Sequence, residues 1–318
     1  MQAARYKYLC GMRDTRPLGK RLKYSLVYWL VRLLIAVANL MPRVWWLRLC
    51  GALGSLAYHF AADTREKAQT HLGLAYAGQL SVREMIALNK KMFRYLGMNA
   101  GDILRAIRVR SLPDLNRFLI THGYEHFEAA QRKGKGVIFL TCHVGAFDLQ
   151  VTSMALRGLK PNIIGTALKD PRLNTLLFDY RNAYGAVAVE RGRETLRLLK
   201  ALKTGGSVAI LIDQDTKVKS RFVNFFGMPA ATPVGAAILA MKTGASVVPT
   251  YVFLDKDWKQ HMHILPELPL VLTGDEEADM VANTQTYTDV TEKIIREHPE
   301  QWVWMHERWK TRPGEEIQ

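Results

Sequence analysis

Residues 136–148 read Gly-Val-Ile-Phe-Leu-Thr-Cys-His-Val-Gly-Ala-Phe-Asp. The apolar run in this stretch is short and is followed by a turn-forming residue, Gly145, which favours a buried strand rather than a helix. The strand leads into His143, and Asp148 follows after four intervening residues. The stretch therefore predicts a strand, a tight turn that carries a histidine, and a helix that begins near a carboxylate.

His143 and Asp148 have a spacing that suits proton transfer. On an unbroken helix the two side chains would point about 140° apart, so they meet only across a turn. In that arrangement a neutral imidazole accepts a proton from a hydroxyl, and the carboxylate holds its other nitrogen. The same spacing also occurs by chance, and a histidine at the end of a strand is often structural. On the spacing alone, catalysis and a structural role both remain open.

Cys142 lies next to His143 and raises the alternative of a thiol nucleophile. Adjacent residues of a strand point to opposite faces of the sheet, so a direct pair of these two side chains is not expected. We interpret Cys142 as a core residue. The other cysteines, Cys10 and Cys50, complete no metal-binding or disulfide spacing, and the set fits a reducing compartment.

Strands and helices alternate around this stretch. Residues 64–108 carry apolar side chains at helical spacing, and Ser81 with Glu84 predicts a capping box at a helix start. From about residue 117, short apolar runs alternate with helical patterns, which predicts a mainly parallel central sheet covered by helices. The predicted strands are Val137–Cys142, Asn162–Ala167, Ala186–Val189, Ser207–Ile212, Ser246–Phe253 and His261–Leu265. The predicted helices are Phe147–Arg157, Pro171–Tyr184, Glu194–Lys203, Pro233–Lys242 and Glu276–Arg296.

Polar side chains lie near the ends of several predicted strands, where open α/β sheets bind ligands. Asp213 and Arg191 each follow such a strand, and Arg181 lies late in the preceding helix. Asp213 with Asp215 suggests Mg²⁺, but no third ligand has a diagnostic spacing, so we expect no metal there. Residues 222–233 are apolar and bounded by turn formers, and they fit either the wall of an apolar channel or the core.

The charge of the chain is large and uneven. Its 318 residues carry a formal net charge of +15, and residues 1–60 hold ten lysine and arginine side chains against one acid, Asp14. Such an excess favours anionic partners, namely nucleic acid, acidic lipid headgroups or phosphorylated substrates. We find no zinc-finger, RRM or KH signature in the sequence, so nucleic acid is not expected as a partner.

The first 62 residues are expected to attach the protein to a membrane. Tyr24–Met41 is a strongly apolar stretch of 18 residues with one charge, Arg32, and a second stretch, rich in small residues, covers Val44–Ala62. This length is near the minimum for a span and a central arginine is costly, so insertion in the membrane plane is favoured over a crossing. The alternative is a hydrophobic first helix packed on a soluble core. We divide the chain into a membrane-associated segment, 1–62, and an α/β domain, 63–318.

Three blocks of sequence together resemble a known family. They are HVGAFD at 143–148, LKTGGSVAILIDQDTKVKSRFVNFFGMPAATPVGAAILAMKTGASVVP at 202–249, and EQWVWMHERWKTRP at 300–313. In this order they resemble the late acyltransferases of lipid A biosynthesis, the lauroyl/myristoyl transferase family. That family is related more distantly to the glycerol-phosphate acyltransferases. The resemblance covers most of the chain and includes an N-terminal membrane segment.

The resemblance implies a glycerol-phosphate-acyltransferase-like α/β fold in which His143 and Asp148 are the catalytic pair. Arg181 and Asp213 match further positions that the family uses at its active site. Arg191 is a further candidate for substrate binding, because basic side chains suit phosphates on the acceptor or acidic groups of a carrier protein. Other basic candidates for this role are Lys217, Lys219 and Arg221.

The predicted function is that of a membrane-bound O-acyltransferase at the cytoplasmic face of a bacterial inner membrane. It would move a fatty acyl chain from acyl-carrier-protein to a hydroxyl of a phosphorylated glycolipid, expected to be a lipid A precursor. Anionic membrane lipid is a further expected partner. The thioester is already activated, so no metal or organic cofactor is expected. Two alternatives stay open: an acyltransferase for another amino- or glycolipid or for glycerol phosphate, and a non-catalytic membrane-surface binding protein.

Overall fold

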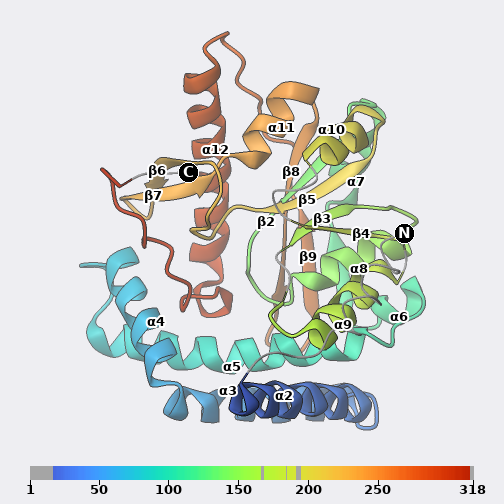
Figure 1. Cartoon of the computed structure of the whole chain (residues 1–318), viewed down its shortest axis with the longest axis vertical. Helices are drawn as coiled ribbons and strands as arrows, with labels where there is room; N and C mark the ends of the chain where they lie inside the picture. Colours follow the sequence, from blue (N-terminus) through green and yellow to red (C-terminus); the bar gives the residue numbers. More distant parts are fainter. Residues whose placement is uncertain (1–16, 166–167, 184, 191–194, 316–318) are drawn as a thin grey trace.

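The computed structural model describes residues 17–165, 168–183, 185–190 and 195–315, and its centre is a seven-stranded sheet (Figure 1). The strand order is β1-β9-β8-β2-β5-β3-β4, and all neighbouring pairs are parallel except β8 and β9. The strands are β1 (Leu119–His122), β2 (Val137–Thr141), β3 (Asn162–Gly165), β4 (Val187–Glu190), β5 (Ser207–Leu211), β8 (Ser246–Leu254) and β9 (Gln260–Ile264). The expected mainly parallel α/β sheet is confirmed.

Helices cover both faces of this sheet. On one face, Phe127 and Leu149 pack with strand residues such as Phe139 in a shared apolar core. On the other face, Leu198 and Tyr287 belong to a second core with Ile138 of the same central strand. The first face is covered by α6 (Leu112–Asn116), α7 (Tyr124–Arg132), α8 (Asp148–Leu156) and α9 (Pro171–Asn182), and the second by α10 (Thr195–Lys203), α11 (Gly235–Thr243) and α12 (Glu276–Glu297).

The predicted elements from residue 137 onward are present, with ends that differ by at most two residues. Thr166 and Ala167, at the end of one predicted strand, lie outside the described residues. The prediction missed β1 and a two-stranded antiparallel hairpin, β6 (Ser220–Phe225) and β7 (Met228–Pro233). A short run such as β1 lacks the length and alternation that identify a strand.

The hairpin resolves the two interpretations of the apolar segment 222–233. Phe225 and Phe226 are buried and pack with the tryptophans that follow α12, including Trp302. A 3-10 turn, η1 (Pro299–Gln301), leads from α12 into that tryptophan block. The core interpretation of this segment is therefore confirmed.

Four helices form the N-terminal part of the described chain, and three of them lie across the carboxyl ends of the parallel strands (Figure 1). The capping box of Ser81 and Glu84 is confirmed at the start of α5, with the Ser81 hydroxyl accepting from the Glu84 backbone N–H. The four helices are α2 (Leu18–Val37), α3 (Arg43–Phe60), α4 (Ala62–Ala75) and α5 (Val82–Ala106).

The small residues of the second apolar stretch allow α3 to touch α5. A Cβ atom on Gly54 would lie 2.2 Å from the backbone oxygen of Phe93, and one on Gly97 would lie 2.2 Å from that of Cys50. The two helices therefore meet backbone to backbone. Trp46 and Leu47 of α3 are fully buried in the resulting contact, which continues to Met98 of α5.

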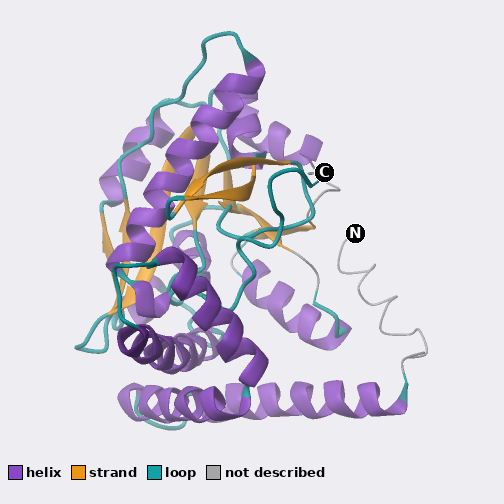
Figure 2. Ribbon diagram, turned by 90° about the vertical axis from the view of Figure 1, so that its left-hand side faces the viewer, coloured by secondary structure: helices purple, strands orange, loops and turns teal. Residues whose placement is uncertain are grey.

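The opposite sides of α2 and α3 expose large apolar side chains at helical spacing. Figure 2 shows α2 as the long helix along the bottom of the molecule, and this helix, described over its whole length, has no buried residue. The inner side of α2 does contact the protein, since Leu34 and Val37 pack against the buried cluster of Trp46 and the Arg172 guanidinium lies over the Tyr28 ring. Membrane attachment and packing on a soluble core therefore both stay open for this helix. Among the helices of the described chain, none is both long and apolar enough to cross a membrane. The exposed side chains include Leu18, Leu22, Leu26, Trp29, Leu30 and Leu33 on α2, and Trp45, Leu49, Leu53, Leu56 and Phe60 on α3.

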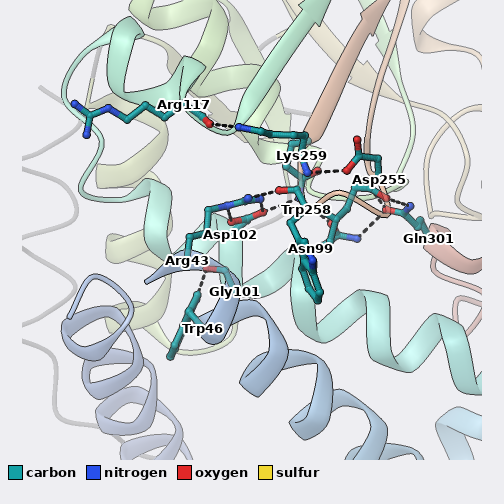
Figure 3. Close-up of polar contacts among 12 residues, drawn as sticks. Arg43, Trp46, Asn99, Gly101, Asp102, Arg117, Asp255, Trp258, Lys259 and Gln301 are labelled. Carbon is teal, nitrogen blue, oxygen red and sulfur yellow. Dashed lines mark hydrogen bonds and ion pairs between the residues drawn. The ribbon is translucent and has the colours of Figure 1, made fainter. Parts of the chain in front are cut away.

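A buried polar network fastens these helices to the sheet (Figure 3). Arg43, the first residue of α3, donates from Nε to Asp102 Oδ1 of α5 at 2.7 Å and also donates to the carbonyl of Trp258. Gln260, the first residue of β9, donates to the other oxygen of Asp102 at 2.8 Å. Asp102 is fully buried, so the arginine supplies the countercharge that a carboxylate needs there.

Candidate active site

The register of two parallel strands brings His143 next to Asp213. In the ladder between β2 and β5, Thr141 pairs with Leu211, which is its partner 70 positions further along the chain. The same offset, continued two residues beyond each strand, places His143 beside Asp213. Both residues lie at the carboxyl ends of their strands, where side chains are free of the ladder and open α/β sheets bind ligands.

Asp213 accepts three hydrogen bonds in a buried position. Its Oδ1 lies 2.8 Å from Nδ1 of the His143 ring, and its Oδ2 accepts from the His143 backbone N–H at 2.7 Å. Trp302 Nε1 donates to Oδ2 at 2.8 Å. Burial alone would raise the pKa of Asp213, but the charge of His143 and these hydrogen bonds outweigh it and lower the pKa to about 2. Asp213 is therefore ionised at neutral pH.

The pairing determines which nitrogen of His143 is available for chemistry. An ionised carboxylate only accepts hydrogen bonds, so Nδ1 carries the hydrogen and Nε2 keeps its lone pair. The His143 side chain is 21% exposed, whereas the Asp213 side chain is fully buried. The arrangement has the geometry that a general base needs, with a buried carboxylate that orients the ring and can stabilise an imidazolium.

Gly145 shapes the turn that presents His143. Its φ of +60° is left-handed, and a Cβ atom there would lie 2.1 Å from the carbonyl oxygen of Val252 in β8. Its backbone N–H donates to the carbonyl of Gln301 at 3.0 Å, and Val144 forms a β-bridge with Trp302. The turn is therefore held against the C-terminal tryptophan block.

The partner expected for the imidazole, Asp148, has a different contact. Asp148 is the first residue of α8, and its Oδ1 accepts from Arg181 Nε at 2.9 Å and Nη2 at 2.8 Å. The expectation that Asp148 holds the second ring nitrogen of His143 is wrong, since Asp213 makes that bond. Asp213, expected to contact substrate, instead faces the imidazole from a buried position.

An apolar pocket adjoins the Asp148–Arg181 ion pair on the face covered by α8 and α9. Phe147 connects the pocket with the histidine, because it lines the pocket and its ring contacts the His143 ring edge to face at 4.9 Å between centroids. The pocket runs between the sheet and the two helices. Its apolar lining includes Phe139, Val151, Met154, Ile163, Leu211 and Met262.

The other residues predicted for the site do not lie beside His143 in the described chain. Arg191, together with Arg193, lies outside the described residues. Arg221 forms an ion pair with Glu277 of α12, and Asp215 accepts from the backbone N–H of Thr311 at 2.7 Å. Cys142 is buried as expected, and burial raises the pKa of its thiol well above the ordinary value.

The C-terminal block contributes residues that the sequence interpretation did not assign to the site. Trp302 bonds to Asp213, and Arg308 is fully buried behind the hairpin, where it donates to the carbonyl of Ala231 at 2.6 Å. Burial lowers the pKa of Arg308 to about 10, although Asp213 and Asp215 act in the opposite direction. Within the block WVWMHERWK, an arginine among tryptophans was the available signal, because apolar surroundings rarely contain an arginine without a polar role.

Comparisons with known proteins extend over nearly the whole chain. Residues 15–311 match the family described as "Bacterial lipid A biosynthesis acyltransferase". The chain is 28% identical over 304 residues to Lipid A biosynthesis lauroyltransferase of Escherichia coli (strain K12), covering 90% of this chain and 93% of that protein. It is 27% identical over 298 residues to Lipid A biosynthesis palmitoleoyltransferase of the same strain, covering 90% and 92%. It is also 27% identical over 225 residues to Phosphatidylinositol mannoside acyltransferase of Mycobacterium tuberculosis (strain CDC 1551 / Oshkosh), covering 69% and 66%.

Proposed function

The chain belongs to the bacterial lipid A biosynthesis acyltransferase family, and from this premise we propose its substrates and mechanism. The proposed reaction moves a fatty acyl chain from an acyl-carrier-protein thioester to a hydroxyl of a phosphorylated glycolipid, a lipid A precursor. The observation that carries the proposal is the His143–Asp213 pair, which lies at the carboxyl end of the sheet beside an apolar pocket. Because the family consists of acyltransferases, the non-catalytic alternative is not retained.

His143 acts as the general base in the proposed step. Its Nε2 removes the proton of the acceptor hydroxyl while the hydroxyl oxygen attacks the thioester carbonyl. A C–O ester bond forms, the C–S bond breaks, and the imidazolium returns the proton to the departing thiolate. Asp213 stabilises the imidazolium through Nδ1. We assign the oxyanion to the backbone N–H groups of residues 146–148, just before the first hydrogen-bonded turn of α8, since those of Leu149 and Gln150 already donate to the carbonyls of Ala146 and Phe147.

Asp148 and Arg181 have a second role in this proposal. Their ion pair lies on the wall of the apolar pocket, and the Asp148 and Arg181 side chains are only 9% and 13% exposed. The apolar lining of the pocket suits the first carbons of the acyl chain, and the ion pair fixes the start of α8 against α9 at the point where the chain meets the reacting carbonyl. Both residues of the predicted pair, His143 and Asp148, are therefore needed, but for different reasons.

We further propose that the protein lies in the plane of the cytoplasmic leaflet of a bacterial inner membrane. The support is the exposed apolar side of α2 and α3, since contiguous apolar patches mark interaction sites. Lysine and arginine side chains on the same helices, such as Lys20, Lys23 and Arg32, suit anionic lipid headgroups. These helices lie across the carboxyl end of the sheet, which is the end that carries His143 (Figure 1). A lipid acceptor would then reach the site from the membrane.

A second acceptor class has specific support. The similarity to a phosphatidylinositol mannoside acyltransferase favours another glycolipid as acceptor, with the same chemistry at His143. It covers 69% of this chain, against 90% for the lauroyltransferase, so we retain the lipid A precursor as the main proposal. Glycerol phosphate has no comparable support.

Transfer by the purified protein in detergent tests the proposal. The donor is acyl-carrier-protein or coenzyme A carrying a C10–C16 chain. The acceptor is a lipid A precursor, a mannosylated phosphatidylinositol, or none, and the products are identified by mass spectrometry. We expect transfer only with acyl-carrier-protein and the lipid A precursor. Transfer from coenzyme A but not from acyl-carrier-protein would contradict the proposed donor. Transfer to the mannoside but not to the lipid A precursor would contradict the proposed acceptor.

The His143→Ala variant tests the assignment of the base. We expect its rate of transfer to fall by about 10²–10⁴-fold, the usual contribution of a general base. The matched control is His126→Ala, which removes a histidine of α7 away from the site and is expected to keep the parent rate. A His143→Ala variant that retains a rate within about threefold of the parent contradicts general-base catalysis at this position.

A further inference from the structure

Three histidines gather at one edge of the sheet, in residues that the proposed reaction does not use. His122 of β1 pairs in register with His263 of β9, and His261 lies two positions before His263 on the same face of β9. One ring nitrogen from each histidine can be chosen so that all three lie within 4.8 Å of one another. Among the described residues, this is the group of histidine, cysteine and acidic side chains close enough to share a metal ion.

A carboxylate orients one of these rings. Asp255, in the turn between β8 and β9, lies with its Oδ2 2.8 Å from Nε2 of His261. The other nitrogen of that ring, Nδ1, lies 2.9 Å from Nε2 of His122. Because the carboxylate accepts from Nε2–H of His261, the neutral ring has its lone pair on Nδ1, and it points toward His122.

We propose that His122, His261 and His263 bind a divalent transition-metal ion, with Zn²⁺ as the best fit. Imidazole ligands suit zinc, nickel, cobalt and copper, whereas magnesium and calcium prefer oxygen ligands. Zn–N bonds of about 2.0–2.1 Å require ligand nitrogens roughly 3.3 Å apart in tetrahedral geometry. His122 Nε2 and His261 Nδ1, hydrogen-bonded at 2.9 Å, are already this close. The His263 ring, which stacks on the rings of His122 and Tyr251, has to approach by about 1.5 Å when the ion binds.

One of the proposed ligands is held by a second group, as the histidine ligands of metal sites usually are. The pair of Asp255 and His261 is the carboxylate–histidine arrangement that orients a metal ligand and raises its basicity.

The site would fasten the edge of the sheet to the membrane-proximal helices. The other oxygen of Asp255 accepts from the backbone N–H of Lys259 at 2.7 Å (Figure 3). The same turn contains Trp258, whose carbonyl accepts from Arg43 of α3. A metal held by β1 and β9 therefore stabilises the turn on which α3 is anchored. Its expected role is structural, separate from the chemistry at His143.

Metal titration of the purified full-length protein without a histidine tag tests this site. After dialysis against EDTA, Zn²⁺ and Co²⁺ are titrated by calorimetry and by the visible spectrum of Co²⁺, with Mg²⁺ as the oxygen-preferring comparison. We expect one equivalent of Zn²⁺ to bind, tetrahedral Co²⁺ bands to appear, and the melting temperature to rise. Failure of the parent protein to bind Zn²⁺ or Co²⁺ more tightly than Mg²⁺ overturns the proposal.

Variants locate the ion. His122→Ala and His263→Ala are expected to weaken Zn²⁺ binding at least tenfold, and Asp255→Asn to weaken it about 10–100-fold through the His261 ring. The control His126→Ala should bind as the parent does. Equal affinity in all variants would place any bound metal elsewhere and overturn the assignment. If a variant fails to fold, the Co²⁺ spectrum of the parent still decides, because imidazole coordination is read from its bands. Acyl transfer is not the readout, so failure here leaves the proposed reaction untouched.

Discussion

Tryptophan has opposite environments on the outer side of the N-terminal helices and in the C-terminal block. Trp29 of α2 and Trp45 of α3 are 64% and 62% exposed, whereas Trp302 and Trp304 are fully buried. Both buried rings have a partner for their N–H group: Trp302 donates to Asp213, and Trp304 donates to the carbonyl of Pro299. The N–H group of a buried tryptophan commonly has such a partner, whereas an amphipathic ring at the surface suits the headgroup level of a membrane.

The difference teaches that apolar composition does not by itself indicate a core. In the N-terminal helices, small residues such as Gly54 face the protein together with the buried Trp46, whereas many large residues such as Leu26 face outward. In the C-terminal block, the large residues face inward and lie behind the turn that carries His143. The N-terminal helices are expected to bind the membrane, whereas the C-terminal block is expected to stabilise the turn that carries His143.

Membrane retention should change most when the exposed side of α2 is made polar. Replacement of Leu22, Leu26, Leu30 and Leu33 by Ser removes side chains that would each contribute about 1.5–3 kcal/mol on burial in lipid. We expect the variant to leave membranes in a carbonate wash that retains the parent, with an unchanged melting temperature in detergent, because α2 contains no buried residue over its described length. Retention of the variant by membranes would remove α2 as the anchor. Release of the parent by salt alone would indicate charge rather than apolar insertion.

Catalysis should depend on Asp213 in a way that differs from its dependence on Asp148. Asp213→Asn is expected to lower kcat/KM by about 10²–10⁴-fold and to shift its pH profile, because the imidazole loses its counterion. Asp148→Asn is expected to lower the rate without that shift, since its partner is Arg181. The measurement is the rate of transfer from pH 5 to pH 9. A shifted profile in Asp148→Asn alone would restore Asp148 as the partner of the histidine.

Stability should distinguish a buried tryptophan from an exposed one. Trp302→Ala is expected to cost about 3–5 kcal/mol of unfolding free energy, through the cavity left behind and the lost bond to Asp213. Trp29→Ala, its matched control, is expected to change that free energy by less than about 0.5 kcal/mol. Denaturant titration in detergent gives both values. Equal losses in the two variants would mean that α2 packs on the protein in solution.

The acid side of the stability curve should contain a contribution from Asp213. Its pKa in the folded protein, about 2, lies below the ordinary value of about 3.9, so the stabilisation is present above pH 4 and is lost as the pH falls toward 2. The loss amounts to about 2 kcal/mol. The difference in unfolding free energy between the parent and Asp213→Asn should therefore narrow as the pH falls from 5 to 2. A difference that is independent of pH would contradict the ionised state of this carboxylate.

Much of the fold follows from local patterns in the sequence. The apolar run 137–141, the alternation after it and the capping box at Ser81 predicted strands and helices to within two residues, because periodicity and capping are local properties. The family was also recognisable from the three sequence blocks, and its match over residues 15–311 agrees. The division of the chain at residue 62 stays a prediction, although α3 is packed closely on α5.

The partner of His143 was decided only by the tertiary structure. Asp148 is near in sequence, but the first turn of α8 directs it toward Arg181. Asp213 lies 70 positions away, and only the parallel register of β2 and β5 brings it to the imidazole. The bond from Trp302 and the cluster of His122 with His263 depend in the same way on elements distant in the chain. Spacing along a chain determines which residues a helix or strand can present, whereas the pairing of strands determines which of them meet.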